Sequence, residues 1–136
     1  FRRVLFRSIT NPGNKTIYRI YDKATGKIRA DLICFVGEAF NPDEDLVIFD
    51  PLETWKKTKL KGGSYTMREL MVPVFRNGEC IYQSPSVKEI AAYCTQEKAT
   101  LWDETKRLFY PHRVYVDLSD KLYAVKKELL NQLGRE

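Results

Sequence analysis

The first half of the chain alternates apolar and polar positions with a period of two, as β-strands do. Residues 16–21 (TIYRIY) are rich in β-branched and aromatic side chains, and apolar positions alternate with charged ones in residues 27–36. Between these runs, residues 22–26 have the composition of a turn. The pattern therefore predicts a β-hairpin with a slightly long loop.

The next segment combines loops and one short apolar run. Residues 37–45 are acidic and contain an Asn-Pro-Asp turn, which predicts an exposed loop. Residues 46–49 are apolar and are followed by Pro51. Residues 52–60 (LETWKKTKL) fit either a strand or a turn of helix, and periodicity leaves both alternatives open.

A second hairpin is predicted in the middle of the chain. Residues 67–75 have the composition of a strand, and Pro73 places that strand at a sheet edge or a bulge because proline lacks a backbone donor. Asn77 and Gly78 form the dipeptide that most strongly favours a tight hairpin turn. The return strand is expected over residues 80–82.

Beyond residue 84 the pattern changes to a helical period. Ser86 followed by Glu89 is a capping box, which begins a helix. The pattern ends at Pro111, and a break is expected near residues 95–100. The apolar positions with broadly helical spacing are Val87, Ile90, Ala91, Cys94, Leu101, Trp102 and Leu108.

A second helix is predicted to begin near Asp117 or Ser119 and to end at Gly134. Its apolar stripe is Leu118, Leu122, Val125, Leu129 and Leu133. Strands first and helices last indicate an α+β fold, with N-terminal antiparallel hairpins followed by two C-terminal helices.

Composition favours a single small domain. The chain has 136 residues, of which 43% are hydrophobic and 12% aromatic, enough for one core. It contains no apolar run long enough to cross a membrane and no recognisable secretory leader. Its three cysteines lack any C-x-x-C spacing, so we expect reduced thiols and a cytoplasmic protein.

The net charge of +5 depends on the first eight residues. The string FRRVLFRS at residues 1–8 matches the translation of a common short-read sequencing adapter, so we expect these residues to be an adapter-derived scar and residues 9–136 to be the domain. Without the three arginines of residues 1–8, 23 − 3 = 20 basic residues face 18 acidic ones, a net charge of +2. We also expect the reading frame to continue upstream.

The residues able to hold a metal or to act as nucleophiles are few. A zinc site would need several of Cys34, Cys80, Cys94 and His112, and their spacing does not favour one. His112 is the only histidine, and no nucleophile motif accompanies it. We therefore predict no catalytic, cofactor-binding or metal-binding residue in the chain.

Two other features suggest binding to phosphate or nucleic acid. The glycine loops at residues 12–15 and 62–64 could present backbone donors to a phosphate, but such loops are far more often turns, and neither clearly leads into a helix N-terminus. Residues 55–61 carry Trp55 among lysines, with Tyr65 and Arg68 beyond, a combination that can stack bases and neutralise phosphates. A nucleic-acid-binding module and an independent interaction domain therefore remain as alternatives, although the small net charge weighs against the first.

Several phrases resemble the C-terminal region of bacterial long-form nicotinate phosphoribosyltransferases, in the order that the family uses. They extend over nearly the whole chain after residue 8, and none is a catalytic motif. The phrases are NPGNKTIYRIYDKATGKIRADLI (residues 11–33), FDPLETWKK (49–57), RELMVPVFRNGECIYQSPS (68–86), and LWDETKRL with PHRVYVDLSDKLYAVKKELL (within 101–130).

The resemblance implies an enzyme that converts nicotinate and phosphoribosyl pyrophosphate, with ATP, to nicotinate mononucleotide and pyrophosphate in NAD biosynthesis. It implies that the catalytic histidine and the phosphate-binding loops lie upstream of Ile9, and His112 matches no catalytic position. No cofactor is expected in this fragment, whereas the parent would use ATP and phosphoribosyl pyrophosphate with magnesium. The expected partners are the N-terminal and barrel domains of the same parent, and a second subunit is a further candidate. We expect the chain to bind neither nucleic acid nor a membrane. We expect the stripe containing Leu118, or one face of the sheet, to dock on that barrel.

Overall fold

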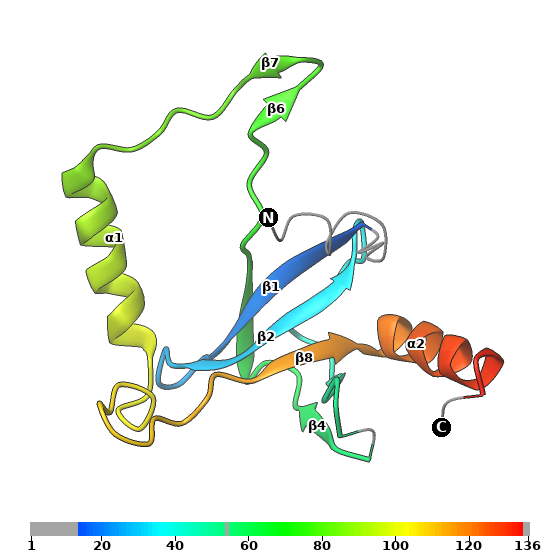
Figure 1. Cartoon of the computed structure of the whole chain (residues 1–136). Coiled ribbons are helices and arrows are strands. Elements are labelled where there is room, and N and C mark those ends of the chain that lie inside the picture. The colour runs from blue at the N-terminus through cyan, green and yellow to red at the C-terminus, as the bar shows by residue number, and fades with distance from the viewer. Residues whose placement is uncertain (1–13, 54, 135–136) are drawn as a thin grey trace, which may run out of the picture.

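The structure is a computed structural model, and it describes residues 14–53 and 55–134. The expected scar at residues 1–8 lies outside the described residues, as do Pro12 and Gly13 of the 12–15 glycine loop. Figure 1 shows a curled sheet, a helix that continues from one of its strands, and a long arm that carries a second helix.

The main sheet has six strands in the order β4-β3-β8-β2-β1-β5. All neighbours are antiparallel except β2 and β8, which are parallel. The strands are β1 (Lys15–Asp22), β2 (Ile28–Phe35), β3 (Leu46–Phe49), β4 (Lys57–Leu60), β5 (Tyr65–Glu69) and β8 (Val116–Ser119). The predicted first hairpin is confirmed. The short apolar run at residues 46–49 forms a strand, and so do residues 57–60 of the undecided segment.

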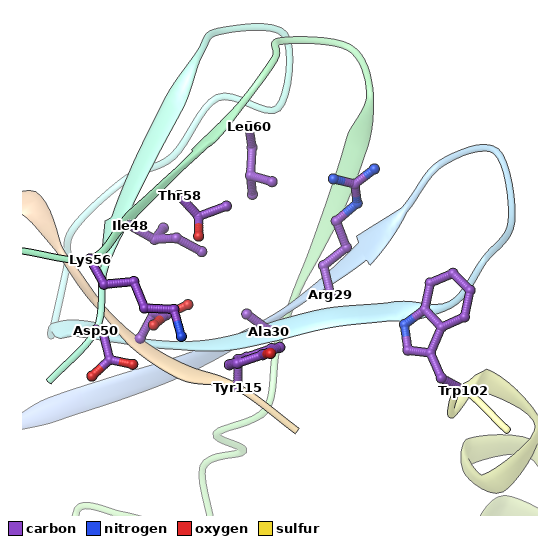
Figure 2. Close-up of a pocket in the computed structure, with 10 residues that line it drawn as sticks. Arg29, Ala30, Ile48, Asp50, Lys56, Thr58, Leu60, Trp102 and Tyr115 are labelled. Atoms are coloured by element: carbon purple, nitrogen blue, oxygen red, sulfur yellow. The ribbon is translucent and has the colours of Figure 1, made fainter. Parts of the chain in front are cut away.

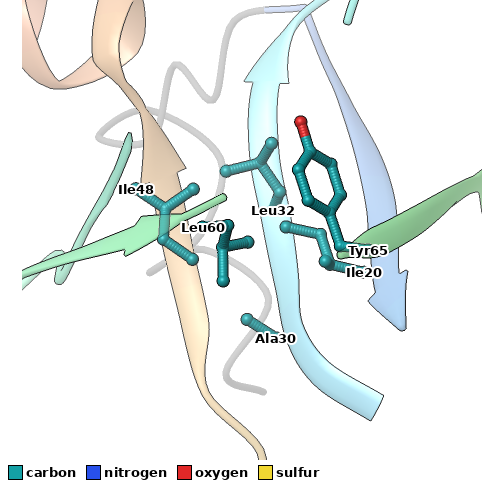
Figure 3. Close-up of a cluster of buried hydrophobic side chains, with 6 residues drawn as sticks. All are labelled: Ile20, Ala30, Leu32, Ile48, Leu60 and Tyr65. Atoms are coloured by element: carbon teal, nitrogen blue, oxygen red, sulfur yellow. The ribbon is translucent and has the colours of Figure 1, made fainter. Parts of the chain in front are cut away.

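One face of this sheet holds the hydrophobic core (Figure 3). In β2 every second residue from Ile28 to Cys34 is buried, as expected because successive side chains of a strand point to opposite faces. The buried cluster is Ile20, Ala30, Leu32, Ile48, Leu60 and Tyr65. The predicted loop at residues 37–45 covers part of this face, since the Tyr65 hydroxyl donates to the Glu44 carbonyl at 2.9 Å and also lies 3.2 Å from the Asn41 carbonyl.

Strand β8 was not predicted, and it corrects the expected start of the second helix. Asp117 and Leu118 lie in this strand, where Leu118 is buried and pairs with Ile33 of β2 and Phe49 of β3. Helix α2 (Asp120–Gln132) begins after Ser119, whose side chain accepts a hydrogen bond from the N–H of Leu122. Ser119 is thus the N-cap, whereas the prediction that Leu118 belongs to the helical stripe is wrong.

Residues 70–115 leave the sheet as an arm and return at β8 (Figure 1). The predicted strand over residues 67–75 is wrong in its second half, because β5 ends at Glu69 and the chain is irregular as far as β6 (Phe75–Arg76). The predicted turn is confirmed: Asn77 and Gly78 have φ values of 50° and 83° and join β6 to β7 (Glu79–Cys80).

Helix α1 (Val87–Thr100) follows the hairpin. Its capping box is confirmed, since the Glu89 N–H donates to Ser86 Oγ and the Ser86 N–H donates to Glu89 Oε2 at 2.7 Å. The helix ends at the expected break, so the helical continuation to Leu108 is wrong, because residues 101–115 are turns and irregular chain. Every residue from 71 to 96 is exposed. The arm therefore has no core of its own within the described chain.

Candidate functional site

A pocket of about 400 Å³ opens on the sheet face between β2 and the β3–β4 hairpin (Figure 2). Residues from the end of the arm complete its wall, so three segments that are distant in sequence meet here. The lining residues are Arg29, Ala30, Ile48, Asp50, Lys56, Thr58, Leu60, Trp102, Tyr115 and Asp117.

Two carboxylates lie in this pocket with different surroundings. Asp50 accepts hydrogen bonds from the N–H groups of Leu52 at 2.8 Å and Glu53 at 2.9 Å, which hold the pKa of its carboxyl below the ordinary value. Asp117 is only 6% exposed, and its carboxylate makes no hydrogen bond or ion pair with any described residue. Burial raises the pKa of Asp117, and the nearby charge of Asp50 raises it further, whereas Lys56 lowers it.

The cations of the pocket are partly engaged elsewhere. Lys56 Nζ lies 3.7 Å from a carboxylate oxygen of Glu53 and 5.3 Å from the centroid of the Tyr115 ring. The Arg29 guanidinium pairs with Asp22, with Arg29 Nε 3.0 Å from Asp22 Oδ2, and this pair lowers the pKa of Asp22 to about 2. Neither cation forms an ion pair with Asp117.

A second cavity of about 380 Å³ adjoins the first, and Arg29, Trp102 and Tyr115 line both. Exposed His112 lines this second cavity, and its backbone N–H donates to the carbonyl of Glu104 at 3.0 Å. The Trp102 indole is fixed by a 2.6 Å hydrogen bond from Nε1 to the Ile28 carbonyl.

An ionic clamp, which we define as Arg19, Asp31, Arg68 and Glu97, ties α1 to the sheet. Arg19 of β1 donates two hydrogen bonds to Asp31, at 2.7 and 2.9 Å, and a third to Glu97 of α1 at 3.2 Å. Arg68 of β5 donates to the other oxygen of Glu97 at 2.9 Å. Burial and the charge of Glu97 both raise the pKa of Tyr21, beside this clamp. Glu97 thus joins two strands to one helix.

The C-terminal end of α1 is held by a separate contact. Lys27 Nζ donates to the carbonyls of Ala99 at 2.8 Å and Leu101 at 3.1 Å. A lysine at a helix C-terminus satisfies free carbonyls and interacts favourably with the helix dipole. The clamp and this contact hold only the last part of α1.

The sulfur and imidazole residues weighed as metal ligands do not come together. Cys34 is buried, with its thiol 3.8 Å from the Thr16 carbonyl, whereas Cys80 and Cys94 are exposed. The apolar environment inferred for Cys94 is therefore wrong. Among residues 14–53 and 55–134, no group of three or more His, Cys, Asp or Glu side chains could hold a metal ion.

The glycine loop at residues 62–64 uses its own backbone donors. The N–H of Gly62 donates to Asp45 Oδ1 at 2.9 Å, and the N–H of Gly63 donates to the Pro42 carbonyl at 2.8 Å. The N–H of Ser64 donates to the Lys61 carbonyl at 3.1 Å. These bonds within the protein do not favour the phosphate-binding interpretation.

The basic segment at residues 55–61 is partly neutralised by neighbouring acids. Lys59 pairs with Asp45 at 2.9 Å, as Lys56 does with Glu53, while Trp55 is 81% exposed. In the part of the chain that the structure describes, no helix is long and apolar enough to span a membrane.

Sequence reasoning did not predict the pocket. The sequence predicted a helix that begins near Asp117 or Ser119, and it gave no role to Asp50. The sequence did contain one signal, the acidic residue Asp117 between Val116 and Leu118 of β8. Because a carboxylate is costly to bury without a partner, an acidic residue between apolar neighbours can indicate a site.

Matches to known proteins cover most of the chain. Residues 14–126 match the family model described as the nicotinate phosphoribosyltransferase C-terminal domain. The chain is 27% identical, over 125 residues, to the nicotinate phosphoribosyltransferase of Bacillus subtilis (strain 168), covering 92% of this chain and 25% of that protein. It shares its fold with the crystal structure of human nicotinic acid phosphoribosyltransferase, with a TM-score of 0.71 and 21% identity over 88% of this chain and 23% of that one.

The chain spans about a quarter of the length of these relatives. The matches agree with the resemblance seen in the sequence phrases and do not favour a nucleic-acid-binding module. Because the family model covers residues 14–126, most of the chain, the chain belongs to the family of nicotinate phosphoribosyltransferase C-terminal domains.

Proposed function

We propose that this chain is the non-catalytic C-terminal part of an enzyme that converts nicotinate and phosphoribosyl pyrophosphate, with ATP, to nicotinate mononucleotide and pyrophosphate. The observation that carries the proposal is the family match over residues 14–126. ATP, phosphoribosyl pyrophosphate and magnesium would bind other domains of the parent.

The role of the domain in the parent is docking. The arm exposes a run of large apolar side chains, and monomeric proteins seldom leave such a run uncovered. Its members are Met71, Val72, Val74, Phe75, Ile81 and Tyr82. The β6–β7 hairpin has two residues in each strand, too few to be stable without support. We place the contact with the parent's other domains on this arm, and a second subunit is a further candidate partner.

Helix α2 is a weaker candidate for that contact. Its outer positions Val125, Leu129 and Leu133 are exposed, but Leu118 is buried in the sheet. The helix is held in place by stacking of Tyr123 on Phe49, with ring centroids 4.2 Å apart, and by a hydrogen bond from Lys126 to the Pro51 carbonyl. Without Leu118, the exposed apolar stripe of this helix is shorter than the sequence predicted.

We also propose a cytoplasmic location, supported by three cysteines that are all free. The activity is tested by measuring nicotinate mononucleotide formation from nicotinate, phosphoribosyl pyrophosphate and ATP. The complete parent should be active and the 136-residue chain inactive. A parent carrying Phe75→Asp in the arm should lose activity or assembly. Ala39→Asp, in the exposed 37–45 loop outside the arm, adds the same single negative charge and serves as the matched control. Turnover by the isolated chain would refute the proposal.

A further inference from the structure

Asp117 lines the pocket that lies between β2 and the β3–β4 hairpin. Asp117 is more than nine-tenths buried, and its carboxylate makes no hydrogen bond or ion pair in the described chain. The fully buried, unsatisfied side-chain atom of the described chain is Tyr21 Oη, so the Asp117 oxygens keep their solvent contact on the pocket side. A carboxylate that is largely desolvated in this way gains from a cation or from N–H donors. The pocket is the space from which a partner can reach it.

The cations that line the pocket leave Asp117 without an ion pair. Arg29 pairs with Asp22, and Lys56, 3.7 Å from Glu53, lowers the pKa of Asp117 without forming an ion pair with it. Asp50 adds a second negative charge to the same lining. A positively charged group that reaches Asp117 would therefore meet a carboxylate with which no described cation forms an ion pair.

The walls of the pocket suit the aliphatic or planar part of such a group. Ile48 and Leu60 provide apolar surface, and the Trp102 ring is fixed by its hydrogen bond to the Ile28 carbonyl. Tyr115 already has the Lys56 ammonium 5.3 Å from its ring centroid, so this ring can accommodate a cation in the pocket.

We propose that this pocket binds an organic cation that carries N–H donors, a guanidinium or a primary ammonium, with Asp117 as its principal partner and Tyr115 and Trp102 as its walls. The cation can come from an arginine or lysine side chain of the parent's other domains or from a free amine. The inference concerns a site outside the proposed reaction and does not depend on it.

Binding is tested with Nα-acetylarginine amide as the probe and Nα-acetylcitrulline amide as its neutral counterpart. Trp55→Phe leaves Trp102 as the only tryptophan of the chain, so its emission reports on the pocket. The arginine probe should change this emission saturably, and the citrulline probe should not. In the same background, Asp117→Asn should weaken binding about tenfold or more, the usual effect of removing a charged hydrogen-bond partner. Asp43→Asn, an exposed acid of the 37–45 loop, should leave binding unchanged.

Lys56→Met provides a second variant that does not alter the carboxylate. Lys56 is exposed at the rim, and removing its charge should strengthen binding about two- to fivefold, in the range of a surface ion pair. Three results would each overturn the proposal. They are equal binding of the two probes, an unchanged probe affinity in Asp117→Asn, and weaker probe binding in Lys56→Met. If circular dichroism shows that Asp117→Asn does not fold, the comparison of the two probes and the Lys56→Met variant still test the proposal.

The source of the cation is distinguished with the complete parent. If a side chain of the parent's other domains fills the pocket, the complete parent should not bind the arginine probe, whereas the 136-residue chain should bind it. If the natural ligand is a free amine, both proteins should bind it. Either result supports a cation site, whereas binding to neither protein overturns it.

Discussion

Replacing Glu97 with alanine should release α1 from the sheet without unfolding the sheet itself. Glu97 is the only member of the ionic clamp that α1 contributes, and it accepts from Arg19 at 3.2 Å and from Arg68 at 2.9 Å. The side chains of Glu97 and Arg19 are 18% and 22% exposed, whereas that of Arg68 is 44% exposed. The first pair is therefore less screened by solvent than the second.

The magnitude follows from these exposures. A charged, partly buried hydrogen bond like that to Arg19 contributes about 1 kcal/mol, and the more exposed pair with Arg68 about 0.5 kcal/mol. Their sum of about 1.5 kcal/mol corresponds to roughly a tenfold increase in the open population of α1. The core residues of the sheet do not contact Glu97 through these bonds, so the strands should keep their stability.

Hydrogen exchange of backbone amides measures both effects at once. Amides in the second half of α1 should lose about tenfold of their protection in Glu97→Ala, while those of β1 and β2 should be unchanged. Gln96→Ala is the matched control, because Gln96 is the preceding residue on the same helix and is exposed. Equal protection of α1 in the two variants would refute the role of the clamp, and so would equal loss throughout the sheet.

Three further outcomes are expected. Gly62→Ala should destabilise the chain by about 1–3 kcal/mol in urea unfolding, because its Cβ would lie 2.2 Å from the backbone oxygen of Asp43; an unchanged midpoint would contradict this. Of the three thiols, only that of Cys34 should resist a thiol reagent until the chain unfolds, since it is buried and burial raises its pKa to about 11; rapid reaction of all three would show otherwise. Because the pKa of Asp117 is raised, the folded state binds its proton more tightly than the unfolded state, so this contribution to stability is present at low pH and is lost as pH rises through the folded pKa. Asp117→Asn should therefore melt higher than the original chain at pH 7 and no higher below about pH 4, and a lower melting temperature at pH 7 would contradict the sign.

The elements that the sequence predicted correctly depend on contacts between near neighbours. The turn at Asn77 and Gly78 needs positive φ at both residues, and the Ser86 capping box is closed by Glu89, three residues away. The first hairpin follows from the alternation in residues 16–36 and its turn. Such signals are complete within a few residues, so no knowledge of the tertiary structure is needed to recognise them.

Strand β8 could not be found in this way, because its partners are far away in sequence. Asp31 pairs with Val116, and Ile48 pairs with Ser119. A strand of four residues is too short to show a clear period of two, and β8 lies directly before a helix. The spacing of the apolar residues therefore assigned Leu118 to the helical stripe. The pocket was missed for the same reason, because β8 brings Asp117 beside β2 and β3.

The misplaced apolar residues of the arm have a different cause, which bears on how the domain works. A strand-like pattern in residues 67–75 and a helical pattern beginning at Val87 both predict burial, yet every residue from 71 to 96 is exposed. Apolar patterning records burial in the complete protein, and this chain spans about a quarter of its relatives. Where the pattern predicts burial and the structure of the chain leaves the side chain exposed, the disagreement marks surface that the rest of the parent is expected to cover. By that criterion we propose the arm, rather than α2, as the principal docking surface: its exposed apolar residues continue from Met71 to Tyr93, whereas those of α2 are Val125 and Leu129, with Leu133 at its C-cap.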